Sequence, residues 1–74
     1  MTYKVNVVIE KDDFGYFAYA PDLKGCHTQG ENLEEVMKNI KEAIELYVET
    51  LSRKERKKIS SKEILTTSLE VAVG

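Results

Sequence analysis

The chain has 74 residues, with 11 basic and 13 acidic side chains and a formal net charge of -2. This length favours one domain, residues 1–74, with a small core that gains support from self-association. Cys26 is the only cysteine, which excludes an intrachain disulfide, and Cys26 and His27 alone are too few soft ligands for a structural zinc. No leader-like N-terminus and no run of about 18 apolar residues occurs, so we expect a soluble, cytoplasmic protein.

The charge is unevenly distributed along the chain. Residues 1–51 hold five lysines and ten carboxylates, a balance of -5, whereas the run from Arg53 to Lys58 carries +4. The acidic front argues against nucleic-acid binding by overall charge. The basic run has two readings: contact with RNA phosphates or an acidic partner, or a solvated helix end whose cations complement the helix dipole. We favour the second reading.

The first 30 residues predict three strands. Residues 3–9 alternate in the period-2 pattern of a half-buried strand, and residues 16–20 form a second strand of aromatics and alanines. Residues 12–15 between them contain two aspartates and a glycine, which is typical of a turn. Pro21 ends the second strand because it has no N–H to donate, and residues 26–29 predict a short third strand that ends at a glycine.

A long amphipathic helix is predicted next. Asn32 is a favoured N-cap with Glu35 three residues on, and apolar residues recur at spacings of three and four as far as Leu51. The basic run can prolong this helix. Residues 67–73 alternate again and predict a fourth strand. The order β-β-β-α-β places the chain in the α+β class, as a two-layer domain with an antiparallel sheet and the helix on one face.

The expected hairpin register divides the side chains between two sheet faces. If Lys11 pairs with Tyr16, then Ile9 lies opposite Ala18, and small alanines let the helix approach that face closely. The other face gathers aromatic side chains that no second helix covers, with acidic residues beside them. The predicted partner-binding residues are Val8, Glu10, Asp12, Asp13, Phe17, Tyr19 and Asp22.

Three segments together resemble the signature of the HicB antitoxin family. They are Gly15–Ala18 (GYFA), Pro21–Gly30 (PDLKGCHTQG) and Asn32–Glu35 (NLEE), the last of which opens the helix. They are similar to the family pattern GY-x-A…PDLPGC-x-T-x-G-x-T-x-x-E-A, an ordered string that is far more specific than a lone glycine motif. Lys24 stands where the family usually has proline, and Val36 where it usually has alanine; a turn and a helix tolerate both.

The resemblance covers residues 3–51 and implies both a fold and a partner. The implied fold is a degenerate ribonuclease-H-like domain. The implied partner is a HicA-like toxin, a small basic protein that cleaves messenger RNA and that the antitoxin blocks. Many family members also carry a C-terminal helix-turn-helix or ribbon-helix-helix. This sequence reads as a short form without that DNA-binding domain, so we expect no specific DNA binding.

No catalytic residue, cofactor or metal site is expected. His27 has no nucleophile or orienting carboxylate placed beside it by sequence, and Cys26 reads as a small buried apolar residue. Two-metal RNA cleavage needs converging carboxylates, whereas the strands offer only Glu10 and Glu70. The preferred hypothesis is a non-enzymatic antitoxin that binds a HicA-like toxin and forms a homodimer or higher homo-oligomer. The alternatives are an orphan HicB-like oligomeric regulatory or binding domain without a toxin, and a residual enzyme.

Overall fold

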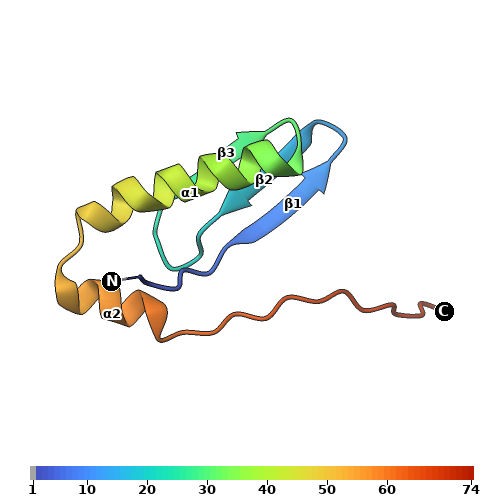
Figure 1. The fold of residues 1–74 in the computed structure, drawn as a ribbon. Helices are drawn as coiled ribbons and strands as arrows, with labels where there is room; N and C mark the ends of the chain where they lie inside the picture. The colour runs from blue at the N-terminus through green and yellow to red at the C-terminus, as the bar shows by residue number, and fades with distance from the viewer. Residues whose placement is uncertain (1) are drawn as a thin grey trace.

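The computed structural model describes residues 2–74 as a sheet covered by a helix on one face (Figure 1). The elements are β1 (Val8–Asp12), β2 (Gly15–Tyr19), β3 (His27–Gly30), α1 (Leu33–Glu49) and α2 (Arg53–Ser60). The strands form one antiparallel sheet in the order β1-β2-β3, and α1 contacts β2 and β3. The predicted α+β class and the β-β-β-α order of the first four elements are confirmed.

The hairpin has the predicted register, but its first strand is displaced along the chain. Lys11 pairs with Tyr16, and Ile9 with Ala18, as expected. The prediction of a strand over residues 3–9 is wrong, because β1 begins only at Val8 and continues to the turn. A strand needs a neighbour to bond with, and β2 ends before Pro21, so residues 4–7 lie outside the ladder.

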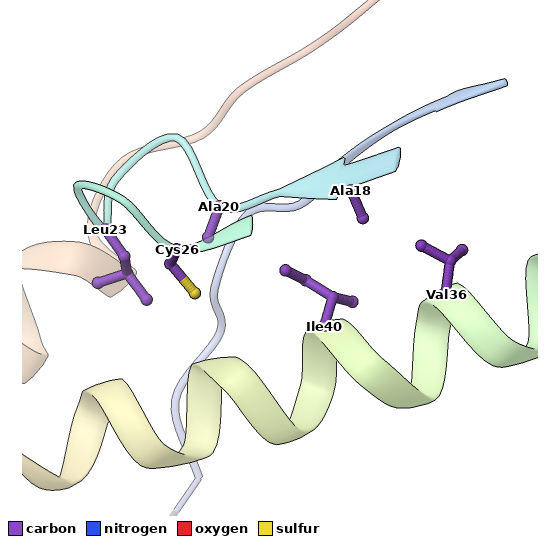
Figure 2. Close-up of a cluster of buried hydrophobic side chains, with 6 residues drawn as sticks. All are labelled: Ala18, Ala20, Leu23, Cys26, Val36 and Ile40. Carbon is purple, nitrogen blue, oxygen red and sulfur yellow. The ribbon is translucent and has the colours of Figure 1, made fainter. Parts of the chain in front are cut away.

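The core lies between β2, the turn that follows it, and α1 (Figure 2). Figure 2 shows the side chains of the sheet layer and of α1 pointing toward one another. The buried core residues are Ala18, Ala20, Leu23, Cys26, Val36 and Ile40. The two alanines contribute little volume, so α1 lies close to β2, as the sequence predicted.

Gly30 allows β3 and α1 to approach each other more closely than any side chain would permit. A Cβ atom at Gly30 would lie 2.6 Å from the backbone nitrogen of Val36 and 2.8 Å from its Cα. Gly30 does not have a positive φ, whereas Gly25 has a φ of 77°. Gly30 is therefore needed for space, and Gly25 for backbone conformation.

Each helix begins at a side-chain cap. The Asn32 side chain accepts a hydrogen bond from the Glu35 N–H at 2.8 Å, and the Glu35 carboxylate accepts one from the Glu31 N–H at 3.3 Å. Ser52 and Glu55 form a reciprocal capping box at the start of α2. The basic run therefore forms a second helix with its own cap and does not prolong α1.

The basic run also completes the end of α1. The last turn of α1 has no basic side chain, and the Arg56 Nε of α2 donates a hydrogen bond to the Val48 carbonyl oxygen at 3.0 Å. This contact places a cation at the negative end of the α1 dipole.

Hydrogen bonds from the Ser52 backbone and hydroxyl lower the pKa of Glu55 at the start of α2. The stability that the Ser52–Glu55 capping box contributes is complete above the ordinary glutamate pKa. It is lost as the pH falls through the lowered pKa of Glu55.

The predicted fourth strand at residues 67–73 does not form in the described chain. Residues 63–74, here called the tail, run as an extended segment away from the sheet (Figure 1). Alternation supplies the pattern of a strand, but a strand also needs an edge to pair with, and the tail has none here. The tail makes the molecule more extended. The radius of gyration of the molecule is 14.5 Å, against about 11 Å for a compact chain of this length.

Gly30→Ala should destabilise the fold by about 1–3 kcal/mol, because the added methyl group meets backbone atoms of α1 that cannot turn aside. Urea unfolding followed by circular dichroism measures the change in free energy of unfolding. Gly74→Ala is the matched control, since nothing lies within 4 Å of a Cβ at that position. Equal stability of the two variants would contradict the close approach of β3 and α1.

Candidate partner-binding face

The sheet face opposite α1 gathers six side chains from three strands. Residues directly opposite each other in an antiparallel ladder point to the same face. Phe17 has Glu10 on one side and Gln29 on the other, while Tyr19 lies between Val8 and His27. The aromatic face is defined here as Val8, Glu10, Phe17, Tyr19, His27 and Gln29.

Three rings form a continuous row on the aromatic face. The ring centroid of Phe17 lies 5.9 Å from that of Tyr19 and 5.6 Å from that of His27, with interplanar angles of 38° and 32°. These are ordinary separations for tilted ring pairs. Phe17 and Tyr19 are only half-buried, because α1 covers the other face. A row of half-buried rings on the sheet face opposite α1 is suited to contact with another protein.

Sequence reasoning gave His27 no catalytic role and did not place it in this row. The available signal was its neighbour Cys26, which was predicted to be buried. Because side chains alternate along a strand, burial of Cys26 places His27 on the opposite, exposed face. A shallow hollow beside the rings is lined in part by Tyr19, Pro21, Lys24 and His27.

One end of the domain is acidic and carries an exposed phenylalanine. The hairpin turn and the start of α1 lie together at this end, whereas α2 lies at the other (Figure 1). The acidic end is defined here by Asp12, Asp13, Glu31, Glu34 and Glu35. Phe14, at the tip of the turn, is 98% exposed, and its N–H donates to Asp12 Oδ1 at 2.8 Å. Sequence reasoning treated Phe14 only as part of the turn.

Asp22 does not belong to the exposed acidic surface, contrary to expectation. Its side chain is only 10% exposed, it accepts a hydrogen bond from Asn6 Nδ2 at 3.1 Å, and Lys62 Nζ lies 3.7 Å from its other oxygen. Asn6 Nδ2 also donates to the Lys62 carbonyl oxygen at 2.8 Å. Asp22 therefore joins the segment before β1, the turn after β2 and Lys62, the residue just before the tail.

The titratable side chains of this region offer little reactive chemistry. Cys26 is buried, and burial raises the pKa of its thiol, so the thiol stays protonated at neutral pH. Among residues 2–74, no three His, Cys, Asp or Glu side chains gather closely enough to hold a metal ion. Over the same residues, no helix combines the length and apolar character needed to cross a bilayer.

Asp22→Ala should lower the free energy of unfolding by about 1–3 kcal/mol, because it leaves Asn6 and Lys62 without their shared acceptor. Asp13→Ala removes an exposed carboxylate of the same type from the acidic end, so it should change stability by no more than about 0.5 kcal/mol. Parallel urea titrations give both values. If the Asp22 variant matched the Asp13 variant, the proposed joining role would be wrong.

Comparison with known proteins gives consistent matches over almost the whole chain. Residues 3–71 match the family described as HicB-like antitoxin of bacterial toxin-antitoxin systems. A UPF0150 protein of Helicobacter pylori is 50% identical over 68 residues, which cover 92% of this chain and 94% of that protein. A UPF0150 protein of Synechocystis is 43% identical over 72 residues, covering 96% and 90% respectively. No solved structure matches the chain at comparable stringency.

Proposed function

Because the chain belongs to the HicB-like antitoxin family of bacterial toxin-antitoxin systems, we propose that it neutralises a small, basic, HicA-like toxin by binding it directly. The observation that supports a binding role most strongly is the uncovered row of Phe17, Tyr19 and His27 beside the acidic end. Rings at the centre of an interface with charges at its edge are the usual arrangement of a protein-binding surface.

In the first step of this proposal, charge guides the encounter. Asp12 and Asp13 at the hairpin turn and Glu10 on β1 are exposed, and the carboxylates at the start of α1 lie at the same end. A ribonuclease toxin needs a positive surface to hold RNA phosphates. Opposite charges raise the rate at which two such proteins meet in the right orientation.

In the second step, the aromatic face supplies the buried contact area. Val8, Phe17 and Tyr19 pack against the toxin, with His27 and the exposed Phe14 extending the apolar contact on either side. Association at the positive surface of the toxin blocks access of RNA to it. The chain thus acts by stoichiometric occlusion of the RNA site.

The same proposal gives the chain no ribonuclease activity of its own and places its action in the cytoplasm. Glu10 lies on β1 and Glu70 in the extended tail, so these two carboxylates do not converge on one metal site. We also propose a homo-oligomeric assembly, a degenerate ribonuclease-H-like topology and no specific DNA binding. An orphan oligomeric domain without a toxin is the competing account.

Phe17→Ala should weaken toxin binding by about 2 kcal/mol or more, mainly through faster dissociation, because it removes the central ring of the row. The measurement is surface plasmon resonance against a purified small, basic toxin of the HicA type. Leu46→Ala is the matched control, since Leu46 is a 67% exposed apolar residue of α1. Equal effects would show that the aromatic face is not the contact, and no binding by the unmodified chain would favour the orphan account.

Reversing charge at Asp12 and Asp13 together should slow toxin association and reduce its dependence on salt, while dissociation changes little. Asp22 is left unchanged, since its reversal would break the contacts with Asn6 and Lys62. The double reversal of Glu42 and Glu45 on α1 changes net charge equally, away from the acidic end. Stopped-flow association rates at several salt concentrations decide the matter. If both variants slowed equally, net charge rather than the acidic end would be responsible.

A further inference from the structure

A second apolar surface lies on the α1 side of the sheet, next to β1. Because α1 lies over β2 and β3, it leaves Ile9 of β1 and Met37 of α1 partly uncovered, with 37% and 48% of their surfaces exposed. A groove runs between α1 and the segment before β1. Its apolar lining consists of Val5, Val7, Met37, Ile40, Ile44 and Val48.

The tail has the pattern of a strand that is suited to such a groove. Its odd-numbered positions from 65 to 73 carry four large apolar side chains, and its even-numbered positions from 66 to 70 are polar. The exposed side chains are Leu65 (85%), Leu69 (82%), Val71 (80%) and Val73 (92%). Chains that act alone in water rarely leave so many apolar side chains exposed in one row, so the odd-numbered side is expected to be covered in the working assembly.

The geometry of its exit directs the tail away from the groove of its own chain. The Lys62 carbonyl is held by Asn6, and the Lys62 ammonium group lies beside Asp22. From that point the tail passes below β1 without joining it in Figure 1, and in Figure 2 it lies on the side of the sheet opposite α1. The groove lies on the α1 side. The tail of a second copy is not held by Asn6 and Asp22 of this copy, so it can enter the groove from the α1 side.

We propose that two copies of this chain exchange tails. Residues 65–73 of one copy pair as a β-strand with the outer edge of β1 and the preceding segment of the other, and the exchange is reciprocal. The odd-numbered apolar side chains then fill the partner's groove. The backbone N–H and C=O groups along this free edge supply the hydrogen bonds. Exchange of a terminal element between identical chains is a low-cost route to a closed dimer.

This arrangement accounts for two period-2 patterns that are not fully used in strand pairing within the single chain. The period-2 pattern of residues 3–9 begins five residues before β1, which starts at Val8. The period-2 pattern of residues 67–73 has no strand at all in the described chain. Pairing between copies gives a neighbour to both segments, and it leaves the aromatic face free for another partner.

The test is the mass of the purified full chain, with no toxin present, measured by light scattering at micromolar concentration. We expect twice the 8.4 kDa chain mass. Leu69→Asp with Val71→Asp should raise the dimer dissociation constant at least about 100-fold, because two buried apolar side chains become charged. Ser68→Asp with Ala72→Asp, which adds the same charge on the other side of the strand, should leave the dimer intact. Circular dichroism checks that each variant folds.

Each other outcome overturns the exchange. A monomer of the unmodified chain contradicts it directly, and hydrogen exchange then shows whether the tail amides are protected on their own sheet or free. A dimer that survives Leu69→Asp with Val71→Asp but is lost in Phe17→Ala pairs through the aromatic face instead. A dimer that the two double variants weaken equally does not place the odd-numbered side in the groove. None of these results bears on toxin binding.

Discussion

The contact between β3 and α1 at Gly30 determines where every other surface of this domain lies. With no side chain at Gly30, Val36 lies close to the sheet backbone, and with only methyl groups at Ala18 and Ala20, Ile40 packs in the same core. This close packing fixes α1 over β2 and β3. It buries one face of the sheet, leaves Phe17 and Tyr19 on the other face only half-buried, and leaves the β1 side without a cover by α1. The aromatic face and the groove beside β1 are both left open because β3 and α1 pack closely at Gly30.

The two uncovered surfaces differ in ways that suit different partners. The aromatic face carries a row of rings and is bordered by carboxylates, so it fits a folded protein of opposite charge. The groove beside β1 is long, aliphatic and next to a free strand edge, so it fits an extended segment. The two surfaces lie on opposite faces of the sheet.

Local patterns in the sequence predicted most of the fold, and long-range packing explains what they missed. Alternation and capping residues are local, so the hairpin register and the start of α1 at Asn32 were predictable. Phe17 and Tyr19 were placed on the exposed face by the same register. The burial of Asp22 depends on Asn6 and Lys62, which are distant in sequence, so its exposed appearance was misleading. Whether residues 67–73 form a strand depends on an available edge, which no pattern within the segment reveals.

The separation of charge also affects how the molecule behaves in an electric field. The acidic end and the basic α2 are separated by the length of α1, whose 17 residues span about 25 Å. This is several times the screening length of about 8 Å at physiological ionic strength. Each end therefore has its own local electrostatic potential. The overall net charge of -2 does not represent the potential at either end. The protein is an elongated dipole that a charged surface will rotate before contact, and anion- and cation-exchange resins will each retain it by a different end.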